Sequence, residues 1–209
     1  MVAFLNGCAG DVNHINPDSY RKDPDFHHDP DHYKWMGQCL AETVLKVNEE
    51  MRMTLAPEIA CTAKVFREKR RQPTAEDSAW AEAWLAAPTN SKTDRIYAEE
   101  LHELTVRPRY AHNVEIQAMR IGDCALVALP GEIFSDVGFA IKKDSPFRNN
   151  MVVELGNGSY GYIVTEPCFT GGIYEAKLAT DNSMFGPATA DKMVKVAGEL
   201  LNELADADR

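Results

Sequence analysis

His112-Asn-Val-Glu-Ile-Gln-Ala-Met-Arg120 alternates apolar with polar residues, which is the pattern of a β-strand with one buried face. A turn follows at Gly122-Asp123, and Cys124-Ala-Leu-Val-Ala-Leu129 is then apolar throughout, as in a strand that is buried on both faces. Two such segments around a short turn predict a β-hairpin. We therefore expect the second strand to lie inside a sheet.

A sharp turn and an acidic residue follow this strand. Pro130-Gly131 ends the strand, and Glu132 is predicted to open a helix that continues through Ile141. In α/β folds, side chains at strand ends point into the crevice where ligands bind. Glu132 is therefore a candidate site residue, with the alternative that it is a first-turn acid favoured by the helix dipole.

Helical and strand patterns alternate along the rest of the chain. They predict an α/β fold in which a layered mixed β-sheet is flanked by helices, in a single domain over residues 1–209. An irregular polar loop is expected at about residues 13–32, and the basic run at residues 67–71 is interpreted as a solvated strand end. The expected strands are residues 2–5, 59–65 and 151–155, and the expected helices are residues 33–53, a helix capped by Thr74 and Asp77, residues 92–104 and residues 189–204.

The composition limits the classes of protein to which this chain can belong. Its 209 residues carry a formal net charge of −10, and such a surface repels the phosphate backbone of nucleic acids. The longest continuous apolar run, at residues 124–130, is far shorter than the ~18 residues of a transmembrane helix. We therefore expect neither a nucleic-acid partner nor a transmembrane segment. The five widely spaced cysteines form no CxxC pair, so neither a zinc knuckle nor a complete disulfide framework is predicted.

Four motifs resemble, in their order along the chain, those of one enzyme family. They are Asn6-Gly-Cys-Ala-Gly-Asp-Val-Asn13, Leu129-Pro-Gly-Glu132, Asn157-Gly-Ser-Tyr-Gly-Tyr162 with Ile163-Val-Thr165, and Tyr174-Glu-Ala176 with Phe185-Gly-Pro187. The ordered set resembles the neutral/alkaline non-lysosomal ceramidases, zinc amidases that hydrolyse the amide bond of ceramide. The resemblance implies that the chain corresponds to the C-terminal part of that family's catalytic N-terminal domain.

The resemblance implies roles for three residues. The family binds one zinc ion through two histidines, a glutamate and a tyrosine, of which the last two match Glu132 and Tyr162. Carboxylate and phenolate oxygens are acceptable zinc donors. Tyr174 matches a catalytic tyrosine that donates a hydrogen bond to the developing oxyanion. The alternatives are structural: Tyr162 as an ordinary strand aromatic and Tyr174 as a side chain that fills a packing gap.

The histidine half of the family's metal site is not matched. The family's two zinc histidines lie upstream of the first motif, so they are expected from an N-terminal part of the same protein that this sequence does not contain. Four histidines occur in the polar loop, at residues 14, 27, 28 and 32, but not in the matching region. Neutral imidazoles suit zinc, yet a solvated loop is the preferred interpretation of these residues.

The nucleophile is the second departure from the family. A serine follows the Gly-Asp pair in ceramidases, and Asn13 stands at the aligned position. An amide has no ionisable oxygen with which to attack a carbonyl. Asn13 is therefore assigned to orienting substrate or water, and Asp11 to holding the glycine-rich turn by accepting backbone N–H groups.

Together these features predict a zinc-dependent amidohydrolase that cleaves an N-acyl amide in a small-molecule or lipid substrate, with ceramide as one candidate. One alternative is a hydrolase that acts on another amide or ester through zinc-activated water and needs no serine. Another is a non-catalytic relative that keeps the fold as a binding or scaffold module, which Asn13 and the unmatched histidines favour. Family members are commonly secreted or at the cell surface, and the resemblance implies a secreted, surface or periplasmic location here.

Overall fold

The computed structural model describes residues 3–14, 18, 22, 31–52, 56–107, 111–179 and 182–207. The chain separates into two compact units. The core unit contains Met1–Val12 and Glu58–Arg209, and the helical unit contains Asn13–Pro57. Most of the loop predicted at about residues 13–32 lies outside the described residues. The single domain predicted for the whole chain stays a prediction.

The helical unit contains α2, His32–Glu50, which confirms the helix predicted at residues 33–53. Its side chains are exposed or half-buried along the whole helix. In the described part of the chain, no helix combines the length and the apolar character that crossing a membrane requires.

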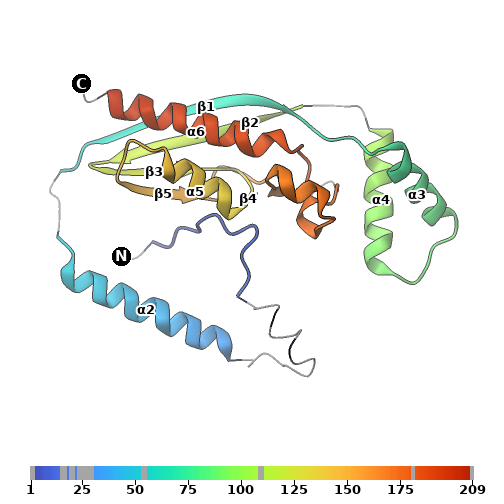
Figure 1. Ribbon diagram of the computed structural model, residues 1–209, viewed down its shortest axis with the longest axis horizontal. Helices are drawn as coiled ribbons and strands as arrows, with labels where there is room; N and C mark the ends of the chain where they lie inside the picture. Colours follow the sequence, from blue (N-terminus) through green and yellow to red (C-terminus); the bar gives the residue numbers. More distant parts are fainter. Residues whose placement is uncertain are drawn as a thin grey trace. The chain divides into compact units, whose positions relative to one another are not determined.

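A four-stranded mixed sheet forms the centre of the core unit (Figure 1). Its order is β1-β2-β3-β5, in which β1 pairs antiparallel with β2, β2 antiparallel with β3, and β3 parallel with β5. The hairpin predicted from residues 112–129 is β2 and β3, and the α/β fold with a mixed sheet flanked by helices is confirmed. The strands are β1, Ile59–Lys69, β2, Ala111–Ile121, β3, Cys124–Ala128, and β5, Asn149–Val153.

Helices α5, Ser135–Lys143, and α6, Ala188–Asp206, pack on the sheet and on each other (Figure 1). The alternation in β2 explains which face they cover, because alternate residues of this strand are fully buried while their neighbours are more exposed. The principal core joins side chains of the sheet to side chains of both helices, among them Val114, Ile116, Ala118, Val127, Val152, Val137, Ile141, Met193, Leu200 and Leu201.

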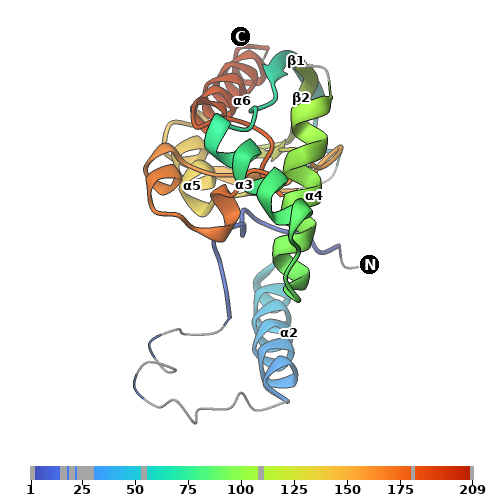
Figure 2. The same ribbon diagram turned by 90° about the vertical axis from the view of Figure 1, so that its right-hand side faces the viewer.

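A helical hairpin lies at one end of the sheet (Figure 1), the end that faces the viewer in Figure 2. It consists of α3, Ala75–Ala86, and α4, Lys92–Val106, and both helices were predicted. The predicted cap is confirmed: the Thr74 hydroxyl accepts the Asp77 backbone N–H at 3.0 Å, and the Asp77 carboxylate accepts the Thr74 N–H at 2.8 Å. Ala81, Ala98 and Leu101 form a small core of the hairpin.

Two short strands replace the helix start that was predicted at Glu132. Glu132–Ile133 is strand β4, and it pairs parallel with β6, Tyr162–Ile163. The predicted start was wrong because the backbone at Glu132 bonds across to Gly161, whose carbonyl accepts the Glu132 N–H at 2.9 Å. The helix begins instead at Ser135, where the Asp11 carboxylate accepts the backbone N–H at 2.7 Å and the hydroxyl at 2.9 Å.

The strand predicted at residues 2–5 is also wrong for its described part. Residues 3–6 lie outside the regular strands, and the segment is held by a single bridge from Gly7 to Val153. The carboxylate of Glu154 attaches the segment further. Its oxygens accept the Asn6 side-chain amide at 2.6 Å, the Ala9 N–H at 3.1 Å and the Ile133 N–H at 3.0 Å. Glu154 therefore joins the N-terminal segment to the strand that carries Glu132.

Glu154→Leu is expected to lower the free energy of unfolding by about 2–3 kcal/mol, because three N–H donors then lose their acceptor. The side chain is only 6% exposed, so water does not readily replace it. Urea unfolding measures the change. Glu82→Leu, at an exposed position of α3, is the matched control and should change stability by less than about 0.5 kcal/mol. Equal losses in the two variants would contradict the anchoring role.

Candidate active site

Glu132 and Tyr162 occupy the same position on neighbouring strands. They are partners in the parallel pairing of β4 with β6, so their side chains leave the sheet on the same side. Backbone hydrogen bonds hold this register: Glu132 N–H donates to the Gly161 carbonyl at 2.9 Å, and Phe134 N–H donates to the Ile163 carbonyl at 3.3 Å. The two residues predicted to bind metal are thus adjacent in the structure.

Two glycines permit the close approach of backbone segments around Glu132 and Tyr162. A Cβ atom at Gly131 would lie 2.8 Å from the Gly161 carbonyl oxygen, and one at Gly10 would lie 2.6 Å from the Glu132 carbonyl oxygen. The Gly10 N–H also donates to the Ile133 carbonyl at 2.9 Å. Three of the motifs noted in the sequence therefore meet through their backbones.

Tyr174 lies beside Tyr162. It begins the short 3₁₀ helix η2, Tyr174–Ala176, and its ring meets the Tyr162 ring edge-on, with centroids 6.0 Å apart and planes at 76°. The Tyr174 side chain is 59% exposed. Its backbone is held by Asn182, whose side-chain amide donates to the carbonyls of Tyr174 at 2.9 Å and Lys177 at 3.1 Å. Glu132, Tyr162 and Tyr174, the three residues to which the resemblance gives roles, therefore form one group.

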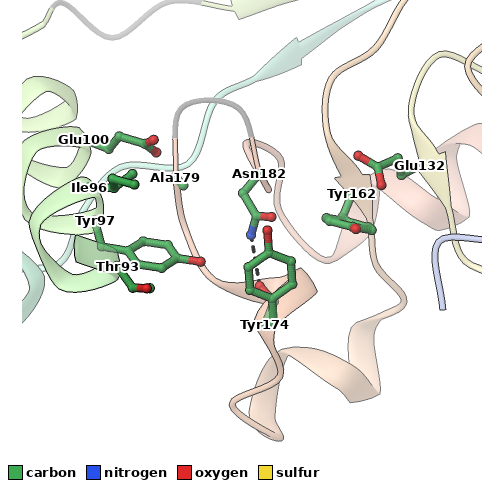
Figure 3. Close-up of a pocket in the computed structure, with 9 residues that line it drawn as sticks. All are labelled: Thr93, Ile96, Tyr97, Glu100, Glu132, Tyr162, Tyr174, Ala179 and Asn182. Carbon is green, nitrogen blue, oxygen red and sulfur yellow. Dashed lines mark hydrogen bonds between the residues drawn. The ribbon is translucent and has the colours of Figure 1, made fainter. Parts of the chain in front are cut away.

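These residues line a cavity of about 480 Å³ (Figure 3). The volume is within the range of small-molecule sites. One wall comes from α4, and the other comes from β4, β6 and the segment that follows η2. The lining residues are Thr93, Ile96, Tyr97, Glu100, Glu132, Tyr162, Tyr174, Ala179 and Asn182.

The electrostatics couple Tyr162 to Glu132. Burial, followed by the hydrogen bond to Glu132 and the charge of that carboxylate, raises the pKa of Tyr162 to about 12. The phenol form is thus favoured, with its O–H as the donor toward the carboxylate. A metal ion would compete for the same two oxygen atoms, because both groups are metal donors once the phenol is ionised.

The described donor set covers half of the zinc site that the resemblance implies. Glu132 and Tyr162 provide two oxygen donors, but among the described residues no three His, Cys, Asp or Glu side chains cluster as a metal site would require. Within the core unit, His102 is exposed on α4, and the His112 ring packs against Tyr160 and Phe185. Both oxygens are donors that zinc accepts, and a zinc ion held by them would need further ligands.

Two solved structures are similar to part of this chain. A neutral ceramidase from Pseudomonas aeruginosa matches 72% of this chain at 16% identity and a TM-score of 0.46. A ceramidase complexed with C2 matches 46% of this chain at 20% identity and a TM-score of 0.40. The chain spans 29% and 15% of the lengths of these two proteins. No protein-family model and no curated protein matches the chain.

The remaining sequence predictions for the site have different outcomes. Asn13 is exposed and is the first residue of the helical unit. Its role in orienting substrate or water stays a prediction. Asp11 accepts a backbone N–H as expected, but the donor is Ser135 at the start of α5 and not the glycine-rich turn. Tyr160, which shares a motif with Tyr162 but received no role, is not part of the cavity lining; its hydroxyl donates to the Asn113 carbonyl at 2.8 Å.

The interpretation of the basic run at residues 67–71 as a solvated strand end holds for the exposed Arg67 and Lys69, where β1 ends, but is wrong for Arg70 and Arg71. Arg70 is buried, and the Arg71 guanidinium donates to the carbonyls of Ala176 and Ser183 and to the Ser183 hydroxyl, all at 2.9 Å. Burial lowers the pKa of Arg71 to about 10. Arg71 thus braces both ends of the segment that carries Tyr174 and Asn182. In the sequence, Arg71 is one of several basic residues in a charged run, and nothing there distinguishes it as buried.

The wall formed by α4 was also missed. Thr93, Ile96, Tyr97 and Glu100 recur at the i, i+3, i+4, i+7 spacing of one helix face. That spacing shows which residues share a face, but it does not show that the face borders a cavity.

Proposed function

We propose that this chain contributes the oxygen-donor half of a zinc-dependent amidohydrolase site that cleaves an N-acyl amide, with ceramide as a candidate substrate. The observation that carries the proposal is that Glu132, Tyr162 and Tyr174, separated in the sequence, line one cavity. The resemblance assigns the metal and the oxyanion to these three residues. The two histidine ligands would come from a further part of the same protein.

Each residue has a distinct task in this proposal. Glu132 and Tyr162 would hold the ion through their adjacent oxygens. Because its pKa is raised, Tyr162 is a phenol without metal and would lose its proton when the zinc ion binds. A bound zinc ion supplies Lewis-acid polarisation of the carbonyl and activation of water. Tyr174, at the edge of the Tyr162 ring, would donate its hydroxyl proton in a hydrogen bond to the oxyanion that forms at the carbonyl.

Metal removal from the full-length protein tests this proposal. We expect about one zinc ion per chain and hydrolysis of ceramide or simpler N-acyl amides, because one ion matches the donor set. Dialysis against a chelator should reduce the rate by at least about a hundredfold, and added zinc should restore it. Metal content is measured by atomic emission, and product amine by chromatography.

A binding or scaffold module is the second candidate, favoured by Asn13 at the position of the family's serine. Full-length protein that retains no zinc and releases no amine would contradict the amidase and support this alternative. Cleavage of esters but not amides would support a hydrolase with a different substrate.

A further inference from the structure

Helix α4 brings to the cavity a set of side chains that lie outside the four motifs. Thr93, Ile96, Tyr97 and Glu100 face the group formed by Glu132, Tyr162 and Tyr174 across the cavity (Figure 3). A wall opposite the reacting groups contacts the part of a substrate that does not react, and such contacts determine specificity. α4 is therefore placed to select among substrates.

Packing holds this wall in position. Tyr97 is 6% exposed although it lines the cavity, and the Lys177 ammonium lies 3.6 Å from the centre of its ring. Behind it, Ala98 and Leu101 pack with Leu178 of the segment that follows η2. The wall is thus attached to the same segment that carries Tyr174, so both sides of the cavity share one support.

The charged side chains among the described residues that line the cavity are acidic, and the Lys177 ammonium that lies against the Tyr97 ring is not part of the lining. Among the described residues that line it, the only formally charged side chains are Glu100 and Glu132, and no lysine or arginine contributes. Glu132 is the register partner of Tyr162 and is assigned to the metal in the proposed function. Glu100 therefore supplies the carboxylate charge on the opposite wall, where its carboxylate points toward the cavity (Figure 3).

We propose that Glu100 makes the site selective for N-acyl amides whose amine component carries a positive charge, and against those whose amine component carries a carboxylate. This inference rests on the proposed function, because it takes the cavity to be the amidase site. A carboxylate in a partly enclosed cavity attracts a nearby cation and repels an anion more strongly than it would in open water.

Three ligands with the same acyl chain test the selectivity: N-octanoyl-ethylenediamine, which is cationic, N-octanoylethanolamine, which is neutral, and N-octanoylglycine, which is anionic. Their affinities for the full-length protein are measured by calorimetry at pH 7. We expect the cation to bind about tenfold more tightly than the anion, a typical effect of one charge at close range. Glu100→Gln should remove most of the difference, and Glu100→Lys should reverse it.

Glu99→Gln is the matched control, because it removes the same charge from the neighbouring residue on the exposed side of α4. Glu99 forms an exposed pair with Arg95 at 3.8 Å, which contributes little to stability. Equal affinities for the three ligands, no binding of any of them, or equal effects of the variants at residues 99 and 100 would overturn the inference.

Hydrolysis rates for the same ligands separate this inference from the proposed function. A preference for the cation that depends on Glu100, without release of amine, would retain the selectivity and overturn the amidase. Release of amine from all three ligands at rates that Glu100→Lys does not change would retain the amidase and overturn the selectivity.

Discussion

Glu132→Gln is expected to reduce hydrolysis of an N-acyl amide by at least about a hundredfold and to weaken zinc binding by a similar factor, since even outer partners of metal ligands are worth about 10- to 100-fold. Glutamine has nearly the same shape but no charge, so the β4–β6 pairing should persist while the anionic donor is replaced by a weaker neutral one. The full-length protein is assayed for kcat/KM and for bound zinc.

Glu166→Gln is the control for this variant, because it makes the same change at an exposed residue of the 3₁₀ helix η1, Glu166–Thr170. It should leave both quantities unchanged. Wild-type activity in Glu132→Gln, with a normal thermal unfolding midpoint, would rule out Glu132 as a metal ligand. Loss of activity with a lowered midpoint would instead indicate a structural role.

Tyr174→Phe is expected to lower kcat by about 10²–10³-fold, the usual cost of removing one oxyanion donor. Phenylalanine keeps the ring that meets Tyr162 edge-on and removes only the hydroxyl. Zinc content and KM should therefore change little, because neither depends on a bond that forms in the transition state. Steady-state kinetics with a single N-acyl amide distinguishes these quantities.

Tyr160→Phe provides the matched comparison. Its hydroxyl donates to the Asn113 carbonyl outside the cavity lining, so the variant should lose about 1 kcal/mol of stability and no catalysis. If Tyr174→Phe retains the full kcat, the hydroxyl does not stabilise the oxyanion. The exposure of Tyr174 would then be that of an ordinary surface aromatic.

Local patterns in the sequence predicted most of the helices and strands. The period-2 alternation of β2, the apolar run of β3 and the Thr74–Asp77 capping box each depend on neighbouring residues, so their signals are complete in the sequence. The errors occurred where a distant segment decides the local conformation. Glu132 joined a strand and not a helix because Gly161 accepts its N–H, and residues 3–6 are held by Glu154.

By itself, the sequence determined the α/β class, the hairpin at its centre and three candidate residues, Glu132, Tyr162 and Tyr174, because periodicity and ordered motifs are properties of the chain alone. Only the tertiary structure decided that these residues share a cavity and that α4 forms its opposite wall. It also decided that Arg71 donates hydrogen bonds to the carbonyls of Ala176 and Ser183, near Tyr174 and Asn182. The physical reason is that strand pairing, burial and close backbone approach act between segments far apart in the chain.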